Sequence, residues 1–224
     1  MQPYESCRPI VSIGQPGAGK SYTMLKCVEF WHEMDTFAEY NFVLPAYNIE
    51  QNNSYEYLNE VQNCNIFNFY HSKIASSIME KQEKLIKKLK KENKDREKFL
   101  PRIFLCVDDS TFQRSSLMKD LSLVQLVTMS RHYNVHVWLL MHVGKNVIPP
   151  SVRNQMMYVF VYDIKPQQIK IIYDEYVSNP DFKNFKEFED YWFDKIEPLE
   201  YKCLLLDTLH KQYSPHVNHW FSSE

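Results

Sequence analysis

Eight consecutive residues near the start of the chain form the clearest chemical pattern in the sequence. They are Gly14, Gln15, Pro16, Gly17, Ala18, Gly19, Lys20 and Ser21. They match G-x-x-x-x-G-K-[ST] at every fixed position. Glycines let backbone N–H groups turn inward and bind phosphate oxygens, and the positive end of a following helix adds attraction. The pattern predicts a site for ATP that these residues and Tyr22 line, with Lys20 on the β- and γ-phosphates and the Ser21 hydroxyl on Mg²⁺.

Two adjacent acids, Asp108 and Asp109, follow the apolar run Ile103–Val107. In phosphate-loop proteins, a carboxylate at the end of a buried strand holds the Mg²⁺ shell, and Asp108 has that position. Asp109 is then placed to orient or polarise the attacking water. Asp109 could instead cap the next turn or helix. Because two acids stand together at a strand end downstream of a phosphate loop, hydrolysis is the favoured interpretation.

Three further polar residues flank the apolar run Val135–Met141. His142 ends this run and could contact the γ-phosphate or the water, although an ordinary exposed histidine at a strand end is the alternative. Arg131 and Arg153 lie near the ends of this strand region. An arginine from a neighbouring subunit would neutralise the charge that develops in phosphoryl transfer. For either arginine taken alone, a surface salt bridge is the more common arrangement.

These groups need secondary-structure elements that bring them to one edge of a sheet. Apolar runs predict strands at Pro9–Ile13, Phe42–Tyr47, Asn65–Tyr70, Ile103–Val107, Val135–Met141, Met156–Tyr162 and Lys202–Leu206. Pro45 indicates that the second of these is an edge strand or ends there. Helices are predicted at Lys20–His32, His71–Phe99, Leu117–Ser130 and Pro166–Val177, whereas the tail from Gln212 has no clear pattern. Strands that alternate with helices predict an α/β domain with a mostly parallel sheet.

Composition limits the remaining possibilities. The chain has 224 residues, 44% of them hydrophobic, which suits one globular domain. We expect a core over about residues 9–162 and a helical, aromatic C-terminal extension over about 163–224. The net charge of −2 means that any contact with nucleic acid needs a local basic patch. Five scattered cysteines predict reduced thiols in an intracellular protein. No signal peptide is expected, and no apolar run approaches the roughly 20 residues of a membrane span.

Four segments together resemble one superfamily of ATPases. They are GQPGAGKS at 14–21, IFLCVDDS at 103–110, SRHYNVHVWLLMH at 130–142 and IPPSVRNQ at 148–155. In order and spacing they are similar to the FtsK–HerA superfamily of DNA-pumping ATPases, and more narrowly to the viral genome-packaging ATPases of poxviruses, giant viruses and virophages. The resemblance covers about residues 9–162. The family usually has Gln at the position of His142, which puts the sensing role of this residue in question.

The resemblance implies a RecA-like P-loop core, with an additional strand between the strands that carry the phosphate loop and the acids. It further implies a homo-oligomeric ring of five or six subunits, with Arg131 or Arg153 reaching the nucleotide of a neighbour. Double-stranded DNA would pass through the pore into a preformed capsid at a procapsid vertex, driven by ATP hydrolysis. Such a protein works in the host cell cytoplasm or the viral factory, and it can also be associated with the virion.

Two patches have open interpretations. The segment Lys81–Lys98 is rich in lysine and could contact a DNA backbone, although a solvated helix face with i,i+4 ion pairs is the more common arrangement. The turn at 144–146, which contains Lys145, is a second DNA-contact candidate. Phe182, Phe185, Phe188 and Trp192 recur at helical spacing, which favours a core-facing stripe over a subunit interface.

Two other functions remain possible from the residues. A monomeric P-loop kinase of a nucleotide or small molecule would need an arginine-rich lid, and no such cluster stands between Arg114 and Arg153. A scaffold that binds nucleotide without hydrolysing it would have no need of Lys20, Ser21 and the two acids together. The favoured prediction is an ATP-driven DNA translocase that packages a viral genome.

Overall fold

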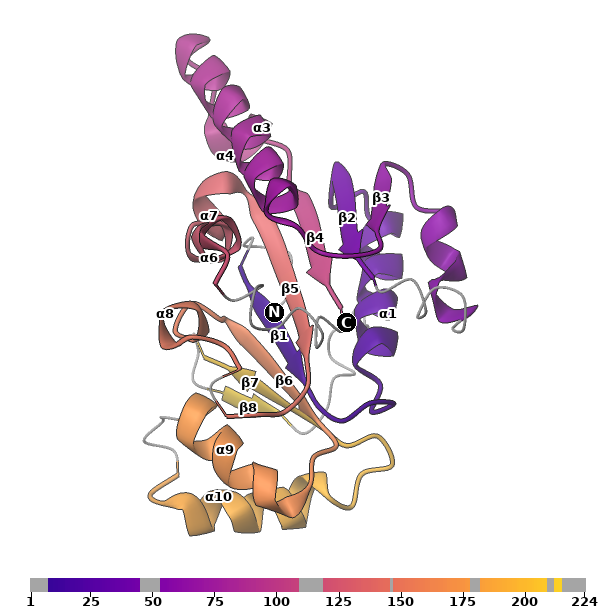
Figure 1. The fold of residues 1–224 in the computed structure, drawn as a ribbon, viewed down its shortest axis with the longest axis vertical. Coiled ribbons are helices and arrows are strands. Elements are labelled where there is room, and N and C mark those ends of the chain that lie inside the picture. The colour runs from indigo at the N-terminus through magenta and orange to yellow at the C-terminus, as the bar shows by residue number, and fades with distance from the viewer. Residues whose placement is uncertain are drawn as a thin grey trace.

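A computed structural model describes residues 8–44, 53–108, 119–145, 147–177, 182–208 and 212–214 of the chain. Within these ranges, eight strands form one sheet in the order β3-β2-β4-β5-β1-β6-β7-β8 (Figure 1). The strands are β1 (Ile10–Ile13), β2 (Glu39–Val43), β3 (Cys64–Phe67), β4 (Ile103–Val107), β5 (Val135–Met141), β6 (Tyr158–Tyr162), β7 (Cys203–Asp207) and β8 (Gln212–Ser214). Strands β1 to β6 pair in parallel, whereas β7 pairs antiparallel with both β6 and β8. This confirms the predicted α/β class with a mostly parallel sheet.

One strand separates the strand before the glycine-rich loop from the strand before the acids. β5 lies between β4 and β1, with Leu139 opposite Val107 and Met141 opposite Ile13. The carboxyl ends of these three parallel strands therefore meet at the same edge of the sheet. This arrangement confirms the additional-strand type of RecA-like core.

Helices cover both faces of the sheet, so the domain has three layers (Figure 1). One face carries α1 (Lys20–Glu33) and the 3₁₀ segment η1 (Asn53–Asn59). The other face carries α3 (Ser72–Lys91), α6 (Leu121–Thr128), α7 (Ser130–Tyr133), α8 (Pro150–Arg153), α9 (Pro166–Tyr176), α10 (Phe185–Tyr191) and the π-helical segment η3 (Trp192–Ile196). The short helix α4 (Arg96–Phe99) follows α3. Strands covered on both faces favour apolar residues on both sides, which explains their mostly hydrophobic runs; the buried polar exceptions include Ser12 of β1 and His136 of β5.

The two faces of the sheet are packed with different side chains. The face toward α3, α6 and α9 is mostly aliphatic, and Leu105 and Val137 are fully buried there. The face toward α1 is rich in aromatic rings, with Phe104 and Trp138 packed against Trp31 of the helix. Aromatic side chains bury a large area each, so α1 and η1 seal this face with few elements. The aromatic stripe predicted near the C-terminus also packs into the core, on the aliphatic face, where Phe188 and Trp192 are fully buried.

The single helix predicted over His71–Phe99 is wrong, because the structure divides it into α3 and α4. α3 ends at Lys91, and Asn93 adopts a left-handed φ of 52°. The Lys94 N–H donates to the Leu89 carbonyl at 3.0 Å and the Asn93 N–H donates to the Lys90 carbonyl at 3.3 Å. These two bonds form a Schellman motif, which terminates a helix by satisfying its last carbonyls. The Asp95 side chain then caps α4 by accepting from the Glu97 N–H.

Other boundaries also differ from the predictions. α6 begins at Leu121 because the Asp120 carboxylate accepts from the N–H groups of the next turn. β2 is an inner strand between β3 and β4, so the edge-strand interpretation of Pro45 is wrong. The alternative is confirmed, because the strand ends at Val43, before this proline, which itself lies outside the described residues. The tail that showed no pattern contributes β8. Among the described helices, none has the length and apolar character that crossing a membrane requires.

Candidate nucleotide site

The glycine-rich loop follows β1 directly and ends where α1 begins. Gly17 and Gly19 have φ angles of 75° and 94°, in the left-handed region that side chains with a Cβ rarely adopt. Gly14 is needed for another reason. A Cβ added there would lie 2.7 Å from the Tyr162 Cβ, so β6 can pass the loop closely only because position 14 has no side chain. All three glycines of the motif therefore have a structural cause.

The carboxyl ends of the neighbouring strands β5 and β6 hold the loop in place through hydrogen bonds. The Gly14 N–H donates to the Met141 carbonyl at 3.2 Å, and the Gln15 N–H donates to the Asp163 carbonyl at 3.1 Å. The Gln15 side chain donates to the Gln168 Oε1 of α9 at 2.7 Å. The loop thus depends on the ends of β5 and β6 as well as on its own sequence, and such bracing keeps it preorganised for a ligand.

Lys20 is turned back into the loop. Its ammonium donates to the Gly14 carbonyl at 3.1 Å and to the Gln15 carbonyl at 2.8 Å, and the residue is 8% exposed. A phosphate in the loop would offer this ammonium charged oxygens in place of neutral carbonyls, and charge-assisted hydrogen bonds are about twice as strong. The position fits the predicted role of Lys20 on the phosphates.

Asp108 and Ser21 meet beside the loop. The Ser21 hydroxyl donates to Asp108 Oδ2 at 2.7 Å, and Asp108 is 3% exposed at the end of β4. Mg²⁺ prefers hard oxygen ligands and usually takes one or two carboxylate or hydroxyl groups from the protein, with phosphate and water oxygens completing its shell. No cluster of three or more His, Cys, Asp or Glu side chains suited to a metal occurs in the described part of the chain. The Ser21 hydroxyl and the Asp108 carboxylate are oxygen ligands of this kind, so the pair fits Mg²⁺ bound together with a nucleotide.

Tyr55, which sequence reasoning did not find, also contacts Asp108. Its hydroxyl donates to the same Oδ2 atom, and the residue is 4% exposed in η1. Burial, followed by the charge of the Asp108 carboxylate, raises the pKa of Tyr55 well above its ordinary value, so the hydroxyl stays protonated and remains a donor. No spacing in the sequence signals this contact, because η1 belongs to the crossover between β2 and β3.

His142 lies at the base of the loop, directly after β5. Its Nδ1 is 3.2 Å from the Gly14 carbonyl oxygen, which also accepts from Lys20. Because a carbonyl oxygen only accepts, Nδ1 carries the hydrogen in this contact. The structure thus brings His142 next to the loop. Asp109 lies outside the described residues, as does Asn146 beside the exposed Lys145.

The two arginines lie at the opposite end of the strands from the loop, near the amino ends of β5 and β6. Arg131 is exposed in α7, before β5, and the seven residues of β5 span about 23 Å at roughly 3.3 Å each. Arg131 therefore cannot reach the loop of its own chain. Arg153 ends α8, before β6, and forms an ion pair with Glu175 of α9 at 2.8 Å. Its guanidinium also lies 5.7 Å from the centre of the Tyr176 ring, so contacts within the chain hold this arginine.

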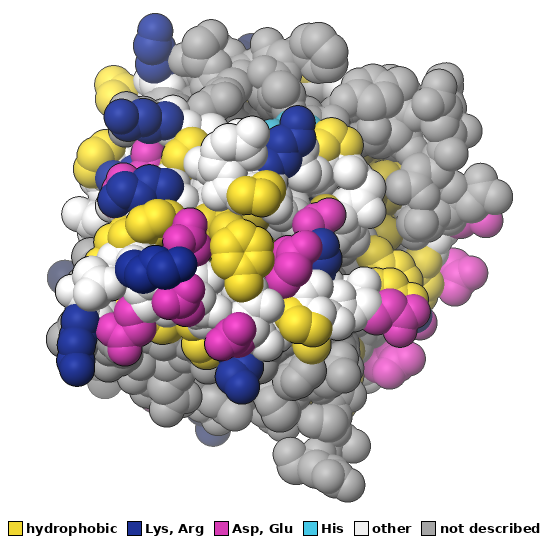
Figure 2. All heavy atoms as spheres, turned by 90° about the horizontal axis from the view of Figure 1, so that it is seen from below, with side chains coloured by type: hydrophobic (Ala, Val, Ile, Leu, Met, Phe, Trp, Pro, Cys, Tyr) yellow, Lys and Arg dark blue, Asp and Glu magenta, His cyan; other side chains and the backbone are white. Residues whose placement is uncertain are grey.

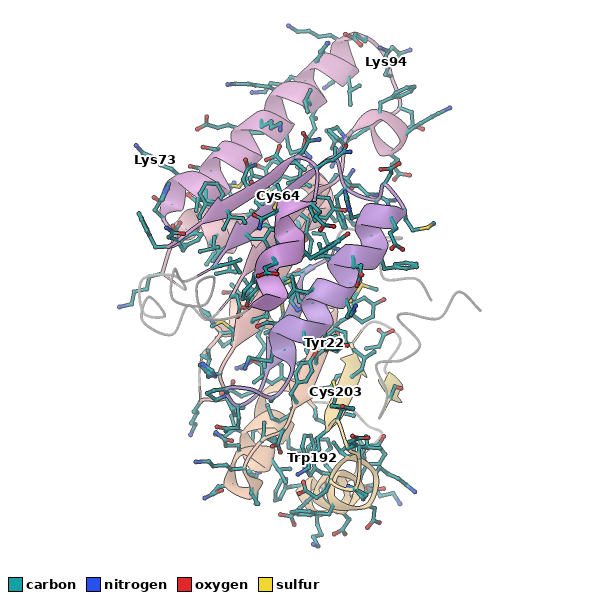
Figure 3. The ribbon with its side chains drawn as sticks, turned by 90° about the vertical axis from the view of Figure 1, so that its right-hand side faces the viewer. Tyr22, Cys64, Lys73, Lys94, Trp192 and Cys203 are labelled. Carbon is teal, nitrogen blue, oxygen red and sulfur yellow. The ribbon has the colours of Figure 1, made fainter. Side chains whose placement is uncertain are left out.

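Tyr22 also lies apart from the loop interior. It is 63% exposed on the first turn of α1, on the outer side of the helix (Figure 3). A ring in this position is available to stack on a group outside the loop, and it makes no contribution to the hydrophobic core.

The sequence by itself has no close match among known families. No protein-family model matches it, and no curated protein is similar to it at a significant level.

The fold, in contrast, is similar to that of solved structures. The genome-packaging NTPase B204 from Sulfolobus turreted icosahedral virus 2, in complex with AMP, superposes with a TM-score of 0.59 at 13% identity, over 93% of this chain and 96% of that one. The DNA-packaging ATPase B204 from Sulfolobus turreted icosahedral virus gives 0.57 at 14% identity, over 96% and 98%. ATPases 2 and 3 of EssC from Geobacillus thermodenitrificans give 0.59 at 16% identity, over 79% of this chain and 35% of that chain. The expected resemblance to viral packaging and FtsK-type ATPases is thus confirmed for the fold: this chain has the RecA-like fold of P-loop ATPases.

Proposed function

We propose that this protein is an ATPase that moves double-stranded DNA into a preformed viral capsid. One observation carries the proposal: Lys20, Ser21 and Asp108 meet at the carboxyl edge of β1 and β4, with β5 between these strands. This is the arrangement that binding of a nucleoside triphosphate with Mg²⁺ requires. B204, whose fold is similar, has been solved with AMP, AMPPCP and ATPγS, which supports ATP as the ligand here.

The residues have distinct roles in the proposed reaction. Backbone N–H groups of the loop and Lys20 bind the phosphates and hold the triphosphate in line for attack. Ser21 and Asp108 hold Mg²⁺, which when bound neutralises charge on the phosphates. Asp109 orients the attacking water and accepts its proton. His142 lies at the base of the loop, where it can contact the γ-phosphate or that water.

A ring of five or six copies is part of the proposal. Because Arg131 is exposed at the edge opposite to its own loop, a neighbouring copy is the partner whose nucleotide it can reach. There it would neutralise charge that develops on the phosphates during transfer. Arg153 is the second candidate, although its ion pair with Glu175 must open first. We place the assembled protein at a capsid vertex, in the host cytoplasm or viral factory.

The experiment that tests the proposal is ATP hydrolysis with Mg²⁺, with and without long duplex DNA, over a range of protein concentrations. We expect DNA to stimulate hydrolysis and the specific activity to rise with concentration, because each site is completed by a neighbouring copy. A specific activity that changes neither with added DNA nor with protein concentration would contradict the proposed translocase function. In that case a monomeric kinase is the alternative, and small phosphate acceptors should be screened.

A further inference from the structure

One helix of this protein carries an isolated stripe of positive charge. α3 contains seven lysines and two glutamates in 20 residues, although the whole chain has a net charge of −2. Its buried residues, among them Ile74, Ile78 and Gln82, lie on one side. Opposite to them, positions 73, 77, 80, 84, 87, 88 and 91 share the outer face at helical spacing. Five of these seven are lysines, and Glu80 is the single acid.

Most of the stripe lysines are not neutralised by acids. Within the described residues, Lys73, Lys84, Lys87 and Lys91 form no ion pair, whereas Lys88 has only a contact of 3.9 Å with Glu92. The other end of the molecule differs, because Lys170 pairs with Asp174 and charges of both signs alternate there (Figure 2). The charge of the stripe is therefore available to an external anion.

The position of α3 makes the stripe accessible over its length. The helix projects away from the sheet toward one end of the molecule (Figure 1), and all seven positions of its outer face are exposed. Lys73 marks its start, and Lys94 lies just beyond its end (Figure 3). From Lys73 to Lys91 the stripe runs about 27 Å, at about 1.5 Å per residue. Duplex DNA rises about 3.4 Å per base pair along its axis, so the stripe spans the length of about eight base pairs.

We propose that this stripe of α3, formed by Lys73, Lys84, Lys87, Lys88 and Lys91, binds the phosphate backbone of duplex DNA. The inference rests on the proposed function and names its DNA-contacting surface. A linear array of ammonium groups suits a linear polyanion and needs no base reading. The stripe contains no apolar residue, whereas a membrane-surface helix or a protein interface would need apolar anchors.

The test is fluorescence anisotropy of a labelled duplex of about 30 base pairs, longer than the stripe, over a range of salt concentrations. The variant K73Q/K84Q/K87Q/K91Q should bind more weakly, and its log–log salt slope should fall by roughly 3.5, at about 0.9 per lost phosphate contact. The matched control K170Q/K183Q/K186Q/K195Q removes four exposed lysines from the α9–α10 end and should keep the wild-type slope.

Two results would overturn the inference. One is an equal affinity and slope in both quadruple variants. The other is a change in self-association of the α3 variant by sedimentation, without a change in DNA binding, which would assign the stripe to a subunit contact. ATP hydrolysis without DNA, measured in parallel, separates these outcomes from failure of the proposed function. If hydrolysis is present and the wild type binds no duplex, both the stripe and the translocation are wrong, and only the ATPase remains.

A second inference rests on a different observation, the two hydroxyls at Asp108. Ser21 and Tyr55 both donate to Oδ2 of this buried carboxylate. Tyr55 is buried in η1, and η1 packs on α1. There the Tyr57 hydroxyl is 2.9 Å from His32 Nδ1, while the Gln62 N–H donates to His32 Nε2 at 3.4 Å.

We infer that Tyr55 is a positioning residue, which sets the orientation of Asp108 for Mg²⁺. Its hydroxyl restrains the carboxylate so that Ser21 and Asp108 form one preset pair. Partners of this kind behind a metal ligand typically change metal affinity about 10–100-fold when they are removed. This inference also rests on the proposed nucleotide site, and it is independent of DNA.

The test compares Tyr55→Phe with Tyr57→Phe, which removes a hydroxyl from the same segment without touching Asp108. The readout is the affinity of a fluorescent ATP analogue, measured in EDTA and as a function of Mg²⁺ concentration. We expect Tyr55→Phe to need about ten-fold more Mg²⁺ and to bind normally in EDTA. Tyr57→Phe should match the wild type. If Tyr55→Phe binds the analogue with the Mg²⁺ dependence of the wild type, Tyr55 does not position Asp108 for Mg²⁺.

A double variant keeps the test decisive if the loss of the hydroxyl also affects folding. In an Asp108→Asn background, Tyr55→Phe should add no further change in Mg²⁺ dependence, because the residue acts through Asp108. Additive effects of the two substitutions would contradict the inference. If the wild type does not bind the analogue under any condition, the proposed function itself fails.

Discussion

At the scale of single residues, the site depends on which groups share an acceptor. The Gly14 carbonyl accepts from Lys20 and lies beside His142, while Asp108 Oδ2 accepts from Ser21 and Tyr55. Each shared atom links a residue of the glycine-rich motif to a residue from another segment. The motif is therefore one half of the site, and the residues that orient it come from elsewhere in the chain.

Lys20→Ala should remove most nucleotide binding and turnover. The ammonium is the single positive side chain that the structure places inside the loop in the described residues. Loss of a charge-stabilising group of this kind typically costs about 10²-fold or more in turnover. ATP binding and steady-state hydrolysis check the prediction, with Lys26→Ala on the exposed side of α1 as the control. Normal hydrolysis in Lys20→Ala would contradict the whole site.

Asp109→Asn should retain nucleotide binding and lose hydrolysis. An amide cannot accept the proton of the attacking water, and general base catalysis contributes about 10²–10⁴-fold. Single-turnover hydrolysis beside equilibrium binding separates the two effects. Unchanged turnover would assign Asp109 to a capping role, which was the alternative open from the sequence.

At the scale of elements, the loop is shaped by the strands beneath it. Hydrogen bonds from Gly14 and Gln15 reach the ends of β5 and β6, and position 14 packs against β6. Packing between elements therefore decides the loop geometry as much as the glycine content does.

Gly14→Ala should destabilise the domain and weaken nucleotide binding. The new methyl would lie 2.7 Å from the Tyr162 Cβ, a clash with a rigid position. Overpacking of this kind costs about 1–3 kcal/mol, and each kcal/mol lowers the melting temperature by about 2–4 °C at this size. Gly17→Asn is the matched control, because asparagine tolerates a left-handed φ and nothing lies within 4 Å of an added Cβ. Thermal unfolding checks whether Gly14→Ala has a lower melting temperature than Gly17→Asn.

His136→Phe should weaken the dependence of stability on pH. His136 of β5 stacks on Phe104, and neither ring nitrogen has a hydrogen-bond partner among the described residues. Burial, followed by the charge of Arg102, lowers the pKa of His136 to about 3, from an ordinary value of 6.5. The unfolded chain therefore takes up a proton below about pH 6.5 that the folded protein does not. The contribution to stability is complete above this pH and is lost as the pH falls toward 3.

Urea unfolding at about pH 7 and about pH 5 measures this difference. Each pH unit below 6.5 costs the wild type about 1.4 kcal/mol through His136, so the phenylalanine variant should gain about 2 kcal/mol relative to the wild type between the two conditions. Parallel loss of stability in both proteins would show that the imidazole is protonated in the folded state.

At the scale of the whole molecule, the nucleotide loop lies at the carboxyl ends of the parallel strands, and Arg131, the residue proposed to reach a neighbour's nucleotide, lies at their amino ends. A single copy therefore has a site on one side and the group that would complete it on the other. We propose that copies assemble head to tail in this way, which closes into a ring when the rotation between copies is regular. We also propose that residues 1–224 form one domain, since β7 and β8 of the C-terminal part pair onto the same sheet.

Arg131→Ala should abolish hydrolysis in the assembled state and leave nucleotide binding intact. Mixing Arg131→Ala with Lys20→Ala should restore part of the activity, because some neighbouring pairs then combine an intact loop with an intact finger. Hydrolysis as a function of mixing ratio measures this complementation. No recovery would favour Arg153, and the same mixing experiment with Arg153→Ala would then be decisive.

Local signals in the sequence were sufficient for several features of this protein. The glycine-rich motif, the strand before it and the helix after it were predicted because close approach to phosphate restricts the residue types at nearly every position. The strands β4 and β5 were predicted at their observed bounds, because burial on both faces favours long, mostly apolar runs. The additional strand came from the resemblance, and the sheet order confirms it.

Tertiary structure decided the features that depend on residues distant in sequence. Tyr55 reaches Asp108 across 53 positions, and no periodicity can indicate a contact made by a crossover segment. The break between α3 and α4 depends on the left-handed Asn93, in a stretch whose composition continues to favour a helix. The two arginines have similar sequence contexts, yet one is exposed and the other is paired with Glu175, because α9 packs beside only one of them. Sequence specifies local conformation and residue chemistry, whereas the partner of each side chain is selected only when the elements pack together.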